Sequence, residues 1–105
     1  MAAVAPDDFD WDDGNREKCQ QHGLTIADIE HVLANAETLI VPDEKNSKVE
    51  PRFLAIGRTA TARYAVVIFA PRRRENETVL RPISARYMHR KEIDKYAQEI
   101  SRTQN

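Results

Sequence analysis

A run of six apolar residues near the middle of the chain, Tyr64-Ala65-Val66-Val67-Ile68-Phe69, constrains the fold more than any other feature. The run does not alternate between apolar and polar residues, so a strand built from it presents apolar side chains on both faces. Such a pattern is typical of a strand that other parts of the protein cover on both sides. We therefore expect residues 63–70 to form a central, buried strand.

Three more strands and three helices are predicted around this strand. The strands cover residues 38–41, 53–57 and 78–87, and residues 71–76 form a charged hairpin loop. The helices cover residues 15–21, a segment that begins with the capping-box pattern Thr25-x-x-Asp28, and residues 89–102. Pro82 cannot donate to the ladder, so we expect an edge or a bulge there. Short connections between adjacent strands predict an α+β fold with two N-terminal helices, a four-stranded antiparallel sheet and a C-terminal helix.

A chain of 105 residues is expected to form one domain, here residues 9–105 after a disordered leader over residues 1–8. The N-terminus lacks the basic and apolar regions of a secretory signal, and no stretch reaches the ~18 apolar residues of a membrane helix. Cys19 is the single cysteine, and the three histidines are widely spaced and follow no metal-ligand pattern. We therefore expect a cytoplasmic protein with no metal site, no cofactor and no membrane partner.

Charge is divided unevenly along the chain. Residues 1–50 carry four bases and twelve acids, whereas residues 51–105 carry twelve bases and five acids. A basic half of this kind suits a polyanion or an acidic partner. The alternative is that the fold interleaves the two halves and spreads their charge.

Several basic and aromatic side chains have two interpretations each. Arg81 and Arg86 lie on or at the end of a predicted strand, where a guanidinium suits either a phosphate or an internal ion pair with Glu50, Glu77 or Glu92. His22 is either a general base or a histidine stabilised by a helix C-terminus. Tyr87 and Trp11 either stack on bases or belong to the core.

Four motifs together resemble the BrnT family of bacterial toxins. The opening motif of these toxins is similar to Phe9-Asp10-Trp11-Asp12 followed by His22-Gly23-Leu24-Thr25. A strand further along their sequence is similar to Arg52-Phe53-Leu54-Ala55-Ile56-Gly57. Arg81-Pro82-Ile83-Ser84-Ala85-Arg86 resembles their ISAR strand, and Tyr87 to Glu92 with Tyr96 resembles the closing helix. The resemblance covers about residues 9–96. The chain departs from it at Lys18, where many members have Asn, and at Pro51, where they have an acid.

The resemblance implies a RelE/ParE-like toxin fold and an endoribonuclease that cleaves RNA without a metal ion and inhibits translation. The 2′-hydroxyl of RNA is then the nucleophile, so the site needs cations for the crowded phosphorane and groups that accept and donate protons. The candidates for stabilising the phosphorane are Arg52, Arg81 and Arg86. The candidates for the general base or acid are His22 and, as the alternative, Glu50. Lys18, one helical turn before His22, adds charge or lowers the pKa of His22. The RNA-binding candidates are Arg58, Arg72, Arg73, Arg74 and Tyr87.

The same resemblance implies a protein partner, a BrnA-like ribbon-helix-helix antitoxin. Operator DNA is then contacted only through this antitoxin. Two other functions remain open from the sequence. One is a catalytically inactive BrnT-like domain that acts with its antitoxin as a DNA-binding repressor. The other is a plain protein-interaction module whose basic half binds an acidic partner.

Overall fold

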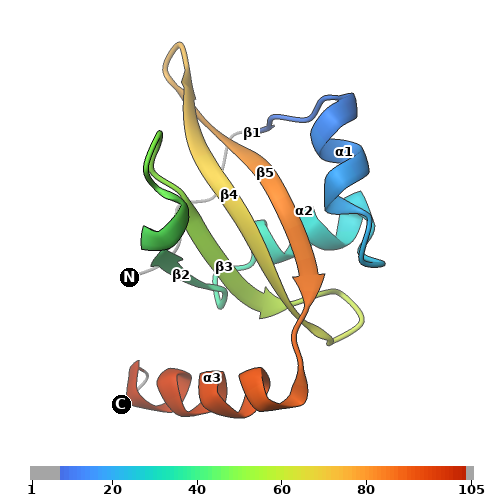
Figure 1. Ribbon diagram of the computed structural model, residues 1–105, viewed down its shortest axis with the longest axis vertical. Helices are drawn as coiled ribbons and strands as arrows, with labels where there is room; N and C mark the ends of the chain where they lie inside the picture. Colours follow the sequence, from blue (N-terminus) through green and yellow to red (C-terminus); the bar gives the residue numbers. More distant parts are fainter. Residues whose placement is uncertain (1–7, 104–105) are drawn as a thin grey trace.

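The computed structural model describes residues 8–103 and shows an α+β fold built on one mixed sheet (Figure 1). Its strands run in the order β1-β5-β4-β3-β2. The elements are β1 (Asp8–Phe9), α1 (Asp13–Cys19), α2 (Ile26–Ala34), β2 (Leu39–Pro42), a short 3-10 turn (Glu44–Asn46), β3 (Phe53–Arg58), β4 (Tyr64–Arg74), β5 (Glu77–Tyr87) and α3 (Arg90–Thr103).

The central strand is confirmed, because β4 lies in the middle of the sheet between β5 and β3. Its two faces are buried to different degrees. On one face Ala65 and Val67 are fully buried, whereas on the other Val66 is 7% exposed and Ile68 is only half-buried. The apolar run therefore predicted the strand's position correctly, but one face of the sheet is less well covered than the other.

The prediction of a four-stranded antiparallel sheet behind two N-terminal helices is wrong. The chain enters the sheet before its first helix, as β1, and pairs in parallel with β5 through Asp8↔Val79 and Phe9↔Leu80. The alternation of aromatic and acidic residues over Phe9-Asp10-Trp11-Asp12 fits a short strand or an anchor, but it is too short to predict which strand it pairs with. Residues 1–7 of the expected leader lie outside the described residues, and Asp8 begins β1.

The charged hairpin loop expected over residues 71–76 is also corrected. β4 continues to Arg74 and pairs with β5 up to Arg74↔Glu77, which leaves a two-residue turn in which Glu75 has φ 57°. Backbone pairing extends past the apolar run because ladder hydrogen bonds do not depend on side-chain hydrophobicity. The bulge expected at Pro82 is confirmed, since the register shifts there: Phe69 pairs with Pro82 and Ile68 with Ser84.

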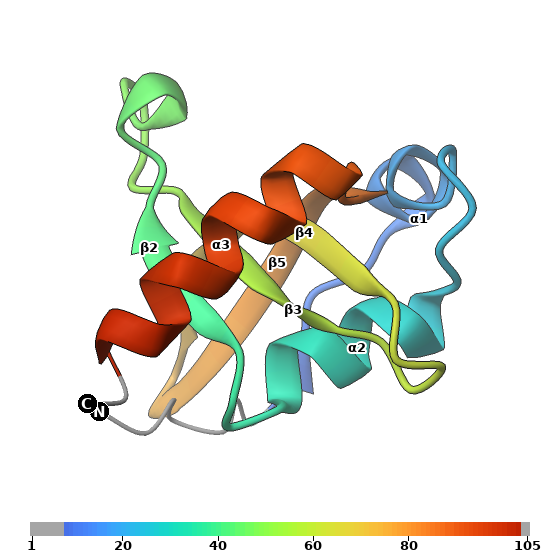
Figure 2. The same cartoon turned by 90° about the horizontal axis from the view of Figure 1, so that it is seen from below.

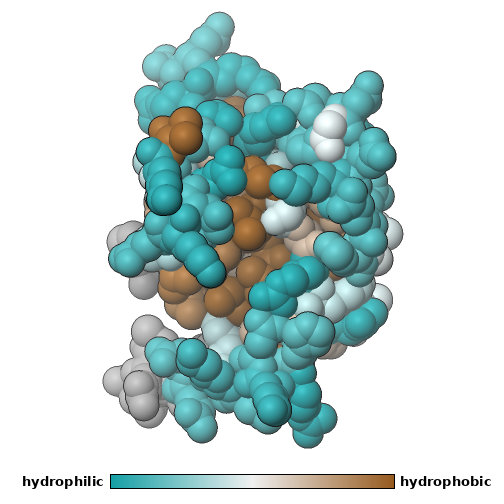
Figure 3. Space-filling model, viewed as in Figure 1, coloured by the Kyte–Doolittle hydropathy of each residue, from teal (hydrophilic) through white to brown (hydrophobic). Residues whose placement is uncertain are grey.

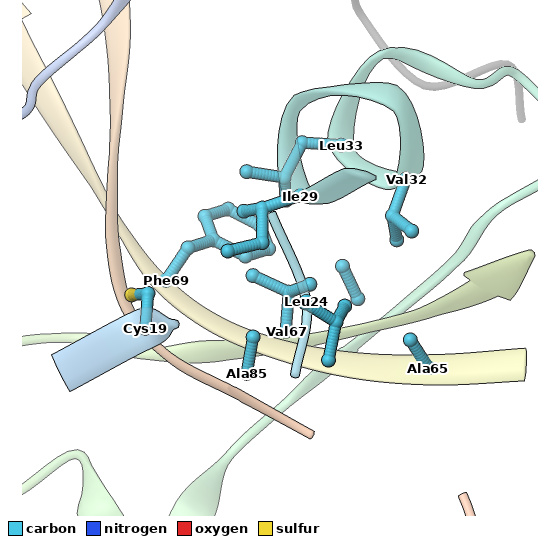
Figure 4. Close-up of a cluster of buried hydrophobic side chains, with 10 residues drawn as sticks. Cys19, Leu24, Ile29, Val32, Leu33, Ala65, Val67, Phe69 and Ala85 are labelled. Carbon is cyan, nitrogen blue, oxygen red and sulfur yellow. The ribbon is translucent and has the colours of Figure 1, made fainter. Parts of the chain in front are cut away.

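Helices α1 and α2 both begin with a capping box, at Asp12 and Thr25 respectively. α2 covers the sheet over β3 and β4, and its apolar side chains meet those of the strands in one cluster (Figure 4). The cluster joins Ile29, Val32 and Leu33 of α2 to Leu24 and Cys19, and to sheet residues such as Val67, Phe69 and Ala85. This core fixes the position of α1 along β5.

Helix α3 lies on the opposite side of the sheet from α2 (Figure 2). The hydroxyl of Tyr96, the one side chain of α3 that is buried among those described, donates to the carbonyl oxygen of Ile56 at 2.8 Å. The rest of this side, which we call the open face, carries half-buried apolar residues such as Leu54 and Ile68 and remains visible as an apolar patch above α3 (Figure 3).

Candidate functional site

Four of the six predicted catalytic residues line one pocket of about 250 Å³, which we call the basic cleft. Lys18 comes from α1, Glu50 and Arg52 from the segment that leads into β3, and Arg81 from β5. Gly14, Asn15, Pro82 and Ile83 complete its lining. The fold thus brings together Lys18 and Arg81, which are 63 positions apart in the sequence.

Backbone contacts position the two arginines of the cleft. The backbone N–H of Arg52 donates to the Ser47 hydroxyl at 3.0 Å, and its carbonyl accepts from the N–H of Asp43 at 2.8 Å. Arg81 lies beside the bulge, opposite Ala70 of β4. The turn after β2 therefore holds Arg52, and the strand register holds Arg81.

Asn15 fixes α1 against this site. Its side-chain nitrogen donates to the carbonyl oxygens of Asp10 at 2.9 Å and Pro82 at 2.8 Å. Its Oδ1 accepts from the backbone N–H of Asp12 at 2.7 Å. Because Asn15 is buried and ties the start of α1 to β5, it determines where Lys18, one turn further on, meets the cleft. Our sequence interpretation did not include Asn15, although the D-x-x-N capping pattern was visible.

Ion pairs neutralise part of the charge. Glu50 accepts hydrogen bonds from Arg72 and lies 3.9 Å from the nearest guanidinium nitrogen of Arg52. Arg81 contacts Asp12 at 2.8 Å and Asp10 at 3.6 Å. The hydrogen bond from Asn15 and then that from Arg81 lower the pKa of Asp12. The acidic N-terminal segment thus meets the basic half of the chain, as the interleaved reading of the charge predicted.

Within residues 8–99, Arg52 Nε is a buried side-chain nitrogen with no hydrogen-bond partner. A buried donor without an acceptor costs about 1–3 kcal/mol, which an anion in the cleft would recover. Among the lining residues, three cations face one carboxylate. The cleft is therefore suited to a bound anion.

His22 and Arg86 lie in a different place, a small pocket of about 90 Å³ that also includes Ser84. Arg86 forms two hydrogen bonds of 2.7 Å with the carboxylate of Glu92, which is the internal ion pair considered for it from sequence. The same contact, followed by the N–H of His89, lowers the pKa of Glu92 to about 2. Lys18 and His22, expected to act together, line separate pockets.

The predicted RNA-binding residues are dispersed. Arg72 adjoins the cleft through Glu50, whereas Arg74 pairs with Asp8 at 3.3 Å and Arg73 is exposed. The Arg58 guanidinium lies 5.3 Å from the ring centroid of Tyr64, away from the cleft. One face of the Tyr87 ring is covered by the Arg63 guanidinium at 3.5 Å, and the ring packs against the core.

Within the part that the structure describes, no group of three or more His, Cys, Asp or Glu side chains is placed to hold a metal ion. None of the helices in that part is long and apolar enough to cross a membrane.

Comparison with known proteins identifies a family. Residues 11–92 match the model of a family described as the ribonuclease toxin, BrnT, of type II toxin–antitoxin systems. No curated protein matches the chain. The matched segment contains every residue that lines the basic cleft.

Proposed function

This chain belongs to the BrnT family of ribonuclease toxins of type II toxin–antitoxin systems, and we propose that its basic cleft is the place where RNA is cleaved. The reaction proposed is metal-independent endoribonuclease cleavage, in which the 2′-hydroxyl attacks the adjacent phosphorus. It yields a 2′,3′-cyclic phosphate and a free 5′-hydroxyl.

One observation carries the proposal: Lys18, Arg52 and Arg81 reach a single cleft from three separate parts of the fold, around the carboxylate of Glu50. The phosphorane carries more negative charge than the RNA phosphate from which it forms. Cations held in position before the reaction stabilise that charge without having to reorganise. The Nε of Arg52, which has no protein acceptor, is a suitable donor for a phosphate oxygen.

We propose that both proton transfers take place within the same cleft. Glu50 takes the proton of the 2′-hydroxyl as that oxygen forms its bond to phosphorus. The bond between phosphorus and the 5′-oxygen breaks, and the Lys18 ammonium gives that oxygen a proton. Glu50 is the better base on geometric grounds, because His22 lines the other pocket.

The wider role follows from the family. A type II system includes an antitoxin protein, so the chain has a protein partner. We propose that cleavage of cytoplasmic RNA inhibits translation. We further propose that the antitoxin is a BrnA-like ribbon-helix-helix protein, and that operator DNA is contacted only through it.

The test is cleavage of an RNA oligonucleotide by the purified protein in EDTA, with the product ends identified. We expect a 2′,3′-cyclic phosphate, and no cleavage where the nucleotide before the scissile bond is 2′-deoxy. Arg52→Ala and Glu50→Gln should each lower the rate by about 100-fold or more. Arg90→Ala, which removes an exposed arginine of α3 that is neither in the cleft nor among the RNA-binding candidates, is the matched control and should cleave normally.

Three results would contradict the proposal. Full activity in Arg52→Ala would place the chemistry elsewhere, and activity that EDTA abolishes would exclude a metal-independent reaction. A wild-type protein that neither cleaves RNA nor arrests growth would favour the inactive repressor or the interaction module.

A further inference from the structure

The open face contains an apolar groove that the proposed reaction does not use. It has a volume of about 450 Å³ and runs between α3 and the strands β2, β3 and β4. Leu54, Val66 and Ile68 lie in its floor, and Lys95 and Glu99 of α3 stand at its rim. Figure 3 shows the apolar side chains gathered on this face, directly above α3.

The groove leads towards both pockets of the candidate site. Val66, Ile68 and Arg86 line the groove and also the pocket that contains His22. Leu54 of the groove lies in β3, two residues after Arg52 of the basic cleft. A molecule seated in the groove would therefore extend into the path of a substrate that approaches the cleft.

The charges distinguish the possible occupants. Two cations, Arg86 and Lys95, and two carboxylates, Glu92 and Glu99, line the groove, so it offers RNA an apolar floor and no net positive charge. The lining of the basic cleft beyond it holds three cations and one carboxylate. A second copy bound symmetrically by the same face would bring two such clefts towards each other. A protein segment with apolar side chains followed by acidic ones complements both parts.

We infer that this groove is the docking site of the antitoxin, which lays an amphipathic segment across the open face with its acidic side chains towards the basic cleft. The inference rests on the proposed function. Membership of the family implies an antitoxin, and an antitoxin that covers this face would block RNA from the proposed cleavage site in the basic cleft. Inhibition then follows from occupancy: the segment fills the groove and denies RNA the cleft.

The test measures binding of the protein encoded by the reading frame adjacent to the toxin gene, by surface binding to the purified toxin. Leu54→Ser removes apolar contact from the groove floor and should weaken binding by about 30-fold or more. Lys95→Glu changes an exposed rim residue, which avoids any effect on folding, and should weaken binding by about fivefold. Lys91→Glu makes the same charge change on α3 outside the groove and is the matched control.

Hydrogen exchange of the complex gives an independent reading. We expect new protection in β2, β3 and α3 and none in α2, which lies on the other side of the sheet. RNA cleavage is measured on the same variants. Lys95→Glu should cleave RNA normally while resisting inhibition, which separates this inference from the proposed function. If the wild type cleaves no RNA but binding responds as expected, only the proposed function fails.

Other results would overturn the inference. One is that Lys95→Glu and Lys91→Glu bind the antitoxin equally well and Leu54→Ser binds it as the wild type does. Another is that protection from hydrogen exchange is confined to the α2 side of the sheet. A toxin that is dimeric by light scattering and becomes monomeric in Leu54→Ser would assign the groove to a second copy. No binding by the adjacent frame's product would also overturn it.

Discussion

Replacement of Asn15 by alanine tests how the fold holds α1 against the basic cleft. Asn15 is 5% exposed, and its side chain makes three hydrogen bonds to backbone groups. One of these, to the carbonyl oxygen of Pro82 at 2.8 Å, crosses from α1 to β5. Alanine removes all three bonds and leaves the Pro82 carbonyl without this donor.

The size of the effect follows from those contacts. Each hydrogen bond contributes about 1 kcal/mol net, so the loss of three should lower the free energy of unfolding by about 3 kcal/mol. In a domain of this size, 1 kcal/mol corresponds to roughly 5 °C, so Tm should fall by roughly 15 °C. Because α1 also carries Lys18, we expect RNA cleavage to fall at temperatures where the variant is still folded.

Thermal and urea unfolding followed by circular dichroism measure this change. Gln20→Ala is the control, because it removes an exposed carboxamide that donates to the Arg16 carbonyl at 3.0 Å. It should alter stability by less than about 0.5 kcal/mol. A loss below about 1 kcal/mol in Asn15→Ala would refute the view that this side chain anchors α1.

Three further outcomes are expected. Val67→Asp places a charge at a fully buried position of β4 and should cost above about 4 kcal/mol, so a soluble variant with unchanged Tm would contradict the central strand. The Arg86 contact, followed by the N–H of His89, lowers the pKa of Glu92 from 4.5 to about 2, so these contacts stabilise the fold above about pH 4.5 and their contribution is lost as the pH falls towards 2. Urea unfolding of wild type and Arg86→Gln should therefore converge at low pH, and a constant difference would contradict this. The association rate of the antitoxin should fall between about 50 and 500 mM salt, and neutralising the Arg72–Arg74 run should slow it modestly, whereas a rate indifferent to salt would show that charge does not steer the encounter.

Local patterns in the sequence determined several parts of this protein. The apolar run predicted β4, the capping pattern at Thr25 predicted the start of α2, and Pro82 predicted the bulge in β5. These features depend on residues close together in the chain, so the sequence is enough to find them. Arg81 was a candidate for phosphate chemistry from its place on a predicted strand, whereas Arg52 became one through the family resemblance.

Only the tertiary structure decided which of those residues meet. Glu50 and Arg52 come beside Arg81 because the register of β3, β4 and β5 brings them to one place, and Asn15 brings Lys18 there. His22 was expected to join them but lies in another pocket. Likewise the short alternation that begins at Phe9 allowed a strand or an anchor, and only the parallel pairing with β5 decided that β1 is a strand. Long-range register and single buried hydrogen bonds set these relations, and neither leaves a periodic signal in the sequence.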